Sequence, residues 1–276
     1  MNESQLCFIG AGNMARSLIG GLLADGYPAG QIRASDPDAG QREAVARRFG
    51  IEAFADNATA VAGAQVLILA VKPQGLAALA HGLAPQLDAT HPLIISVAAG
   101  IRASDLDRWL GGNRALVRCM PNTPALVQSG ATALYATAAV NDAQRNLAES
   151  ILRAVGLTLW VEDEGQMDAV TALSGSGPAY FFLMLEAMQQ AGTELGLPEN
   201  TARLLALQTA FGAAKMALES KDPPGRLRER VTSPGGTTER ALAALEEGGL
   251  RELIANAMRA AQTRSRELAE QLGTDA

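Results

Sequence analysis

The chain has 276 residues, nearly half of them hydrophobic, which is enough for one large domain or two medium ones. Its net charge of −6 argues against nucleic acid and anionic membranes as partners. Cys7 and Cys119 suggest neither a disulfide framework nor a metal site, so we expect a reduced, cytoplasmic setting. We find no signal-peptide pattern, and no apolar run approaches the roughly 20 residues of a membrane span.

Strands and helices alternate in the first half of the chain. Apolar runs rich in Val, Ile and Leu predict strands at Leu6–Ile9, Gln31–Ala34, Val66–Val71, Leu93–Val97 and Ala115–Cys119. Helical spacing appears at Ala15–Ala24, Ala39–Phe49 and Leu76–Leu87. This alternation predicts an α/β fold with a Rossmann-like, doubly wound parallel sheet. Two more strands, around a helix at Asp142–Val155, are expected at Gly130–Tyr135 and Leu157–Val161.

A glycine-rich turn, Gly10-Ala-Gly-Asn-Met-Ala15, follows the first predicted strand. Gly10 suits a tight turn, Gly12 lets a pyrophosphate approach the backbone, and Ala15 allows close packing of helix on strand. The N-terminus of the helix offers free N–H groups and a positive dipole end to phosphates. A glycine turn without a ligand is the alternative, but the order of strand, turn and helix favours a dinucleotide site.

The second strand ends in Ser35 and Asp36, near the spacing of about 20 residues at which a carboxylate holds the ribose hydroxyls of NAD. Ser35, with Arg33, Gln41 and Arg42 nearby, could instead meet a 2′-phosphate. Asp36 is explained equally well as the N-cap of the next helix. The sequence leaves these alternatives open.

The ends of later strands are expected at the same edge of the sheet, where doubly wound folds bind ligands. Lys72 is explained equally well as a solvated lysine. An ordinary turn is the alternative for the loop around Asn122, whose position beside the other strand ends favours a functional role. Small residues at these ends let a flat ring approach closely. The residues expected to bind the cofactor are Gly10, Gly12, Asn13, Met14, Ala15, Ser35, Asp36, Asn57, Ala70, Val71, Lys72, Pro73, Ala98, Ala99, Gly100, Pro121 and Asn122.

After residue 162 almost nothing in the sequence is typical of a strand. Helices are predicted at Glu164–Leu173, Pro178–Leu195, Glu199–Lys221, Thr237–Glu247 and Leu250–Gln271. We therefore divide the chain into a dinucleotide-binding domain, 1–162, and an all-α domain, 163–276. Because Tyr180–Met188 is apolar nearly all round, it must be covered on every side, which predicts an intertwined helical homodimer.

Two turns of the helical domain could carry chemistry. The first turn, Ser174-Gly175-Ser176-Gly177, joins two predicted helices. Its glycines permit sharp bends, and Ser176 can cap the second helix. The second turn, Ser233-Pro-Gly-Gly-Thr-Thr238, runs into a helix near Thr237 and is typical of an anion site. It contains neither Lys nor Arg, so a small carboxylate suits it as well as a phosphate. Plain helix breaks are the alternative for both turns.

Six segments together resemble the pyrroline-5-carboxylate reductase family over almost the whole chain. They are Gly10-Ala-Gly-Asn-Met-Ala15, Ala70-Val-Lys-Pro73, Ser96-Val-Ala-Ala-Gly100, Arg118-Cys-Met-Pro-Asn-Thr-Pro124, Asp168-Ala-Val-Thr-Ala-Leu-Ser-Gly-Ser-Gly-Pro178 and Val231-Thr-Ser-Pro-Gly-Gly-Thr-Thr238. The last three are the most specific. Only the pair Ser35-Asp36 varies in a way that leaves the choice between NADPH and NADH open, with NADP(H) slightly favoured.

The resemblance implies reduction of 1-pyrroline-5-carboxylate to L-proline by NAD(P)H, the last step of proline biosynthesis. It also implies a dimer, often within a larger ring of dimers. Backbone at Gly236 and Thr237 would hold the substrate carboxylate, and the hydroxyl of Thr238, the one catalytic residue, would contact the ring nitrogen from the partner subunit. The residues expected around the substrate are Ser174, Gly175, Ser176, Gly177, Ser233, Gly235, Gly236, Thr237 and Thr238.

The sequence argues against two other functions. A β-hydroxyacid dehydrogenase has a similar domain order but uses a lysine acid/base, and beyond Lys72 the chain has only Lys215 and Lys221, neither beside a glycine-rich turn. A nucleotide-sensing dimer without turnover would not need two further ligand-sized turns. A cyclic imine that enters already protonated needs no histidine or carboxylic acid, which agrees with turns that contain no histidine.

Overall fold

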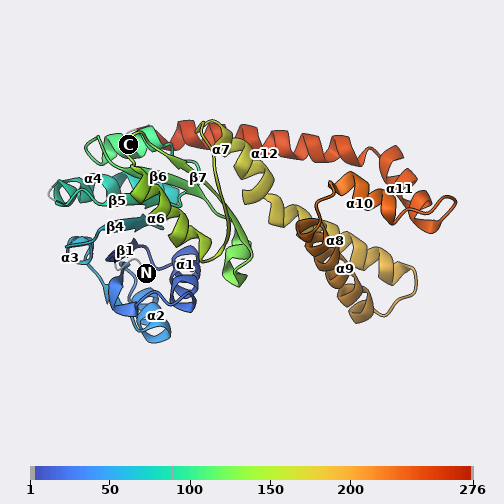
Figure 1. Ribbon diagram of the computed structural model, residues 1–276, viewed down its shortest axis with the longest axis horizontal. Helices are drawn as coiled ribbons and strands as arrows, with labels where there is room; N and C mark the ends of the chain where they lie inside the picture. Colours follow the sequence, from blue (N-terminus) through green and yellow to red (C-terminus); the bar gives the residue numbers. More distant parts are fainter. Residues whose placement is uncertain (1–3, 89, 275–276) are drawn as a thin grey trace. The chain divides into compact units, whose positions relative to one another are not determined.

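A computed structural model describes residues 4–88 and 90–274 (Figure 1). Its eight-stranded sheet has the order β3-β2-β1-β4-β5-β6-β7-β8. The strands are β1 (Leu6–Ile9), β2 (Ile32–Ser35), β3 (Glu52–Phe54), β4 (Val66–Leu69), β5 (Leu93–Ser96), β6 (Leu116–Met120), β7 (Gly130–Ala136) and β8 (Gly156–Trp160). The predicted α/β fold followed by helices is confirmed.

The sheet is mostly parallel, as predicted, with one antiparallel pair that the sequence did not indicate. β1 to β6 run parallel, whereas β7 is antiparallel to β6 and parallel to β8. Only residues 121–129 connect β6 to β7. A parallel crossover needs a dozen or more residues, so this short link forces the chain to turn back.

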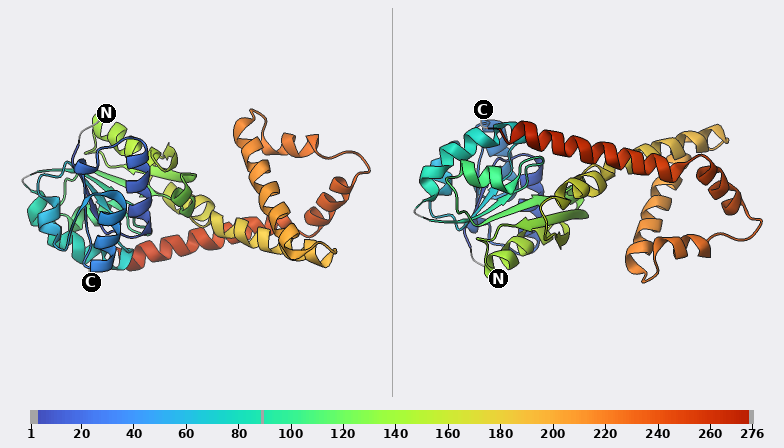
Figure 2. Two further views of the ribbon diagram at one scale, coloured as in Figure 1. Left: turned by 90° about the horizontal axis from the view of Figure 1, so that it is seen from below. Right: turned by 90° about the horizontal axis from the view of Figure 1, so that it is seen from above.

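Helices cover both faces of the sheet (Figures 1 and 2). One apolar core lies under α1 (Asn13–Ala24), α2 (Ala39–Phe49) and α6 (Asp142–Arg153). The other core lies under α3 (Asn57–Val61), α4 (Leu76–Leu87) and α5 (Ala103–Trp109). β1, β4 and β5 are buried along their whole length, as the apolar runs predict. The sequence missed β3, α3 and α5 because three to seven residues carry little periodicity.

Four short turns complete the connections. Three are 3₁₀ turns, η1 (Ala29–Gln31), η2 (Pro73–Gly75) and η3 (Thr123–Val127), and the fourth is a π-helical turn, η4 (Thr171–Gly175). η4 directly follows α7 (Gln166–Val170) and precedes α8 (Gly177–Glu194).

The chain forms two compact units. Unit 1 comprises residues 1–176 and 261–276, and unit 2 comprises residues 177–260. The last turns of α12 (Leu250–Leu272) pack onto unit 1, where Ser265 Oγ donates to Asp168 Oδ1 at 2.7 Å. Arg108 also donates to the carbonyl oxygen of Gly273 at 2.8 Å. The predicted boundary between residues 162 and 163 stays a prediction.

Unit 2 is entirely helical in its described residues. Besides α8 it contains α9 (Glu199–Glu219), α10 (Pro224–Arg230), α11 (Thr237–Glu247) and the first part of α12. α8 and α9 lie side by side, joined by the short link 195–198 (Figure 2). The sequence missed α10, a seven-residue helix that begins at paired prolines. No helix in the described part of the chain is long and apolar enough to cross a membrane.

Candidate active site

The carboxyl ends of five parallel strands form one edge of unit 1. β2, β1, β4, β5 and β6 are successive neighbours, and their register aligns Ser35, Ile9, Leu69 and Ser96 across the sheet. Two backbone hydrogen bonds tie the loops together beyond the strands. Gly10 N–H donates to the carbonyl of Ser35 and Ala70 N–H donates to that of Ile9, both at 2.8 Å. The structure thus brings the predicted cofactor segments to one edge.

The glycine-rich turn contains two glycines with different roles. Gly10 has φ +98°, and a Cβ there would lie 2.6 Å from the carbonyl oxygen of Ala70, so the fold itself requires glycine. Gly12 is the N-cap of α1 with φ −72°, and a Cβ there would meet no atom within 4 Å. The space beside Gly12 is therefore open, which fits the close approach of a pyrophosphate.

The first turn of α1 offers backbone donors at this open space. No side chain caps the helix, so its first N–H groups are available, as an anion site requires. Asn13 is exposed and Met14 is half-buried, whereas Ala15 is fully buried against the sheet. The small side chain of Ala15 allows this close packing.

Ser35 and Asn57 come together at the end of β2. Ser35 is fully buried, and its hydroxyl donates to Asn57 Oδ1 at 2.7 Å. Asn57 is the first residue of α3, which Asp56 caps by accepting from Thr59 N–H. This capping lowers the pKa of the Asp56 carboxyl, through the backbone and side-chain hydrogen bonds of Thr59.

Asp36 is not the N-cap of α2. Asp38 takes that position, accepting from Gln41 N–H at 2.9 Å, because the chain needs two more residues before the helix begins. Asp36 instead accepts from Ala11 N–H and from Asp38 N–H, both at 2.9 Å. Its carboxylate therefore links β2 to the glycine-rich turn.

The two arginines near Asp36, Arg42 and Arg33, have different hydrogen-bond partners. Arg42 donates to the carbonyls of Asp36 and Pro37 at 2.8 Å, at the end of β2. Arg33 donates to the carbonyl of Ala62 at 3.0 Å and pairs with Glu52 at 3.5 Å. Of the two arginines, only Arg42 is bound to the backbone that follows β2.

The segments after β4 and β5 differ in exposure. Lys72 is exposed, while Ala70, Val71 and Pro73 are half-buried at the edge. Ala98 is buried in the core and Ala99 is exposed. Gly100 is also buried, with φ +73°, and a Cβ there would lie 3.6 Å from Leu268 on α12. Gly100 thus packs against the chain's own helix.

The loop after β6 contacts the first predicted turn of the helical part. Pro121 is buried and Asn122 half-buried. Asn122 Nδ2 donates to the carbonyl and to Oγ of Ser174, both at 3.2 Å, and its Oδ1 accepts from Ala131 N–H at 2.9 Å. No signal in the sequence joined Asn122 to Ser174.

The segment Ser174–Gly177 is not the sharp turn that the sequence predicted. Ser176 N–H donates to the carbonyl of Thr171 at 2.8 Å, a π-type bond, and neither Gly175 nor Gly177 has a positive φ. Ser176 is the C-cap residue of η4 and has right-handed helical dihedrals, not the extended backbone of an N-cap. One extra residue per turn lets α7 lead into α8 without a break, and such turns often occur at functional sites.

The second predicted turn, Ser233–Thr238, lies in unit 2 and has the backbone of a tight turn, as predicted. Gly235 has φ +72° and Gly236 N–H donates to the carbonyl of Ser233 at 3.0 Å, a type II turn with Pro234 at its second position. Gly236 is the N-cap of α11, which begins at Thr237 as predicted. No side chain caps this helix, so its first amides are available to an anion.

Glu239 is a residue of this turn that the sequence analysis missed. Its Oε2 accepts from Gly235 N–H at 2.7 Å. A glutamate three residues after the N-cap Gly236 has the spacing of a capping box, and that signal could have identified it. Thr238 is half-buried, whereas Thr237 is exposed.

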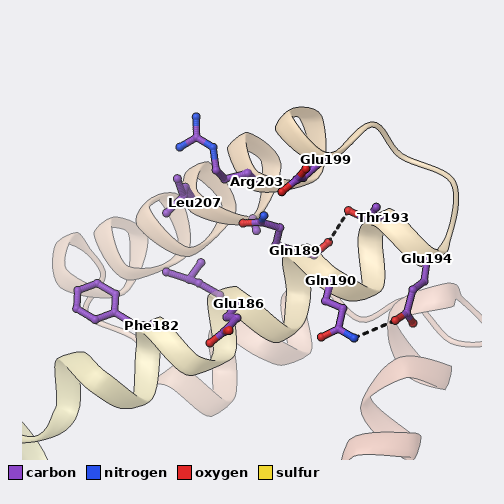
Figure 3. Close-up of a pocket in the computed structure, with 11 residues that line it drawn as sticks. Phe182, Glu186, Gln189, Gln190, Thr193, Glu194, Glu199, Arg203 and Leu207 are labelled. Atoms are coloured by element: carbon purple, nitrogen blue, oxygen red, sulfur yellow. Dashed lines mark hydrogen bonds between the residues drawn. The ribbon is translucent and has the colours of Figure 1, made fainter.

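A separate cavity of about 600 Å³ lies between α8 and α9 in unit 2 (Figure 3). Phe182 and Leu207 lie toward one end, and Glu199 and Arg203 of α9 line the same cavity. None of the predicted site residues lines it. The cavity is therefore a feature of unit 2 that is separate from the candidate active site.

The two thiols of unit 1 are buried in its core. Desolvation raises the pKa of the Cys7 thiol to about 12, and burial also raises the pKa of Cys119. Both are unreactive thiols in this state. Among the described residues there is no cluster of three or more His, Cys, Asp or Glu side chains that could hold a metal ion.

Two family models match the chain. Residues 164–268 match pyrroline-5-carboxylate reductase dimerisation, and residues 5–100 match NADP oxidoreductase, coenzyme F420-dependent. The chain is also 56% identical over 273 residues to the pyrroline-5-carboxylate reductase of Pseudomonas aeruginosa, a match that covers 99% of this chain and 100% of that protein.

Solved structures give the same result. A pyrroline-5-carboxylate reductase from Coxiella burnetii superposes with a TM-score of 0.94 at 46% identity, covering 97% of this chain and 99% of that one. The pyrroline carboxylate reductase of Plasmodium falciparum, a structure with NADP bound, has a TM-score of 0.86 at 28% identity, covering 98% and 99%.

Proposed function

The chain belongs to the pyrroline-5-carboxylate reductase family, and we propose that it reduces 1-pyrroline-5-carboxylate to L-proline with NAD(P)H. The observation that carries this proposal is the full-length match at 56% identity. The geometry supports it, because the open backbone at Gly12 lies at the edge where the predicted cofactor segments meet.

The cofactor residues fall into two groups in this proposal. Gly12 and the first amides of α1 bind the pyrophosphate, since the helix has no side-chain cap and nothing fills the space beside Gly12. Val71, Pro73 and Pro121 line the path of the nicotinamide at the ends of β4 and β6. The bound cofactor supplies the hydride, and the protein supplies placement.

NADP(H) is the cofactor that we favour. Arg42 is held against the backbone just after β2, where it can balance the charge of a 2′-phosphate. The Asp36 carboxylate already accepts two backbone N–H bonds, so it is less available to ribose hydroxyls. A Kd for NADH that is lower than the Kd for NADPH, by titration of protein fluorescence, would contradict this preference.

The substrate residues act by binding and orientation. The free amides at the start of α11 suit the carboxylate of the substrate, and the hydroxyl of Thr238 contacts the ring nitrogen. A cyclic imine is basic enough to enter protonated, so no acidic side chain has to donate to it. Thr238 therefore orients the iminium and does not activate it.

The proposed activity is tested by following the absorbance of NADPH and NADH with pyrroline-5-carboxylate, and then with 2-keto and 3-keto acids as controls. We expect oxidation with the imine alone. Thr238→Ala should lower kcat/KM for the imine by roughly 10–100-fold, through the loss of one or two hydrogen bonds. Unchanged kinetics in this variant would refute the role of Thr238.

We further propose that Thr238 serves the cofactor site of the partner subunit. Hybrid dimers of a Gly12→Ala chain with a Thr238→Ala chain test this directly. If the site is shared, one of the two sites in each hybrid is intact and about half of the wild-type activity returns. If Thr238 acts within its own chain, the hybrids stay as inactive as the parent variants.

The homodimer follows from the dimerisation segment at residues 164–268. We propose that dimers assemble further into a ring, which light scattering would detect as a mass above that of a dimer. We also propose a reducing, cytoplasmic setting, because both cysteines are buried and free.

A further inference from the structure

The hydrogen bonds of Asn122 assign this residue a role of its own. Both polar atoms of its amide are bound within the protein, Nδ2 to Ser174 and Oδ1 to Ala131 N–H. We propose that Asn122 is a positioning residue that holds the π-helical turn η4 at the carboxyl end of β6, and that it is not a cofactor ligand. The inference rests on the proposed function and on the expectation, from the family resemblance, that Ser174–Gly177 lie around the substrate.

The sequence explains why Ser174 needs this partner. In an α-helix its carbonyl would accept from the N–H four residues on, but residue 178 is a proline and has none. A half-buried carbonyl without a donor is unfavourable. Asn122 Nδ2, at 3.2 Å from this oxygen, supplies the missing donor.

A second contact supports the same arrangement. A Cβ on Gly175 would lie 2.4 Å from Met120 Cε, so the backbone of η4 packs closely on the last residue of β6. Met120 and Asn122 thus hold two successive residues of the turn, Ser174 and Gly175. The π-type bond from Ser176 to Thr171 closes the same turn.

Asn122 is itself held rigidly. Pro121 precedes it and Pro124 follows it, which restricts the backbone of the loop. Asn122 is the N-cap of η3, yet its side chain makes no capping bond there, because both of its polar atoms are bound to Ser174 and Ala131. The side-chain amide of Asn122 therefore links Ser174 to Ala131 and does not cap η3.

Asn122→Asp is the variant that isolates this role. It keeps Oδ1 as an acceptor for Ala131 N–H but replaces the donor toward Ser174 by an oxygen. We expect KM for the imine to rise roughly 10-fold, with kcat and the Kd of NADPH within about twofold of wild type. Asn146→Asp makes the same chemical change at an exposed position of α6 and should leave all three values unchanged.

Ser174→Ala is a milder second variant, because the main-chain acceptor remains. We expect a rise in KM of roughly threefold, and the double variant should be no worse than Asn122→Asp alone. Amide hydrogen exchange of residues 171–176 should be faster in Asn122→Asp and unchanged in Asn146→Asp, a readout that needs no substrate.

The outcomes are distinct. A raised Kd of NADPH with an unchanged KM in Asn122→Asp would make Asn122 a cofactor ligand and overturn the inference. A double variant whose rise in KM equals the product of the two single rises would also overturn it. Should Asn122→Asp not fold, amide hydrogen exchange of residues 171–176 in Ser174→Ala decides instead: unchanged exchange overturns the inference and faster exchange supports it. Failure of the wild-type protein to oxidise NADPH with the imine refutes the proposed function instead, and the exchange measurement then decides on Asn122 alone.

Discussion

The two compact units of this chain differ in where their apolar side chains lie. In unit 1, residues such as Phe8, Leu67 and Trp109 are at most 1% exposed. In unit 2, large apolar side chains are exposed to solvent. The exposed fraction is 62% for Phe181, 66% for Leu183 and 83% for Leu218. The only buried residues of its described helices before residue 261 are Gly177, Ala202 and Ala206.

This difference separates a unit that folds around its own core from one that needs a second copy. A sheet with helices on both faces buries its apolar runs within one chain. The segment Tyr180–Met188 of α8 is apolar nearly all round, and the single helix α9 at its side cannot cover it. Contiguous exposed apolar surface of this kind marks an interface, in agreement with the dimerisation match at residues 164–268.

The comparison also bears on the site. The cofactor edge belongs to the unit with a complete core, whereas Ser233–Thr238 lies in the unit that requires a partner. We therefore expect cofactor binding to survive changes that disrupt the dimer, and turnover to be lost with it.

The largest effect is expected from Leu204→Glu on α9, which places a charge on an apolar side chain that is 51% exposed in one chain. Burial of an unpaired carboxylate in the dimer is strongly unfavourable. Turnover should fall more than about 100-fold and the mass in sedimentation should fall to that of one chain, while NADPH still binds. Ala143→Glu, at an exposed position of α6, is the matched control. A Leu204→Glu protein that stays dimeric would remove the contrast between the units.

Paired leucine truncations sharpen the contrast. Leu67→Ala in β4 should lower the free energy of unfolding of unit 1 by about 3 kcal/mol, through lost burial and a residual cavity, without changing the Kd of the dimer. Leu253→Ala, at a position 62% exposed in one chain, should do the reverse and weaken the dimer roughly tenfold. Urea unfolding and sedimentation measure the two effects. Equal changes in both quantities for both variants would contradict two distinct units.

A pair of glycine substitutions separates folding from binding inside unit 1. Gly10→Ala should lower stability by about 2–4 kcal/mol, because φ is +98° and the new Cβ meets the carbonyl of Ala70. Gly12→Ala has open space and a permitted φ, so its Tm should match wild type while its affinity for NADPH falls. Thermal unfolding and fluorescence titration measure both. A Gly12→Ala protein with wild-type affinity would place the pyrophosphate elsewhere.

The smallest effect concerns pH and belongs to unit 1, which holds both cysteines. Burial raises the pKa of Cys7 to about 12 and raises that of Cys119, whereas an unfolded thiol ionises near pH 8.5. The unfolded chain therefore releases protons first as pH rises. Stability should be constant below about pH 8 and fall by about 1.4 kcal/mol per thiol at pH 9.5. Urea unfolding at both pH values, with Cys7→Ala/Cys119→Ala as the reference, measures this.

The sequence predicted two local turns better than the connections around them. Gly10 to Ala15 and the turn before Thr237 were identified because glycines and a helix start leave local signals. Asp36 was misjudged as a candidate cap, since Asp38 two residues later has the same chemistry. The turn at Ser174–Gly177 was mistaken for a bend, since a π-helical turn has no signature in glycine spacing.

The amino-acid sequence by itself determined the alternation of strands and helices, the dinucleotide turn and the requirement for a second copy, because these depend on periodicity and on residues near one another in the chain. Only the tertiary structure decided that β7 runs against β6 and that Asn122 binds Ser174, 52 positions away. It also showed that Asp36 accepts from the amide of Ala11. Contacts of this kind depend on how the strands are ordered in the sheet, and local patterns in a single sequence carry no information about that order.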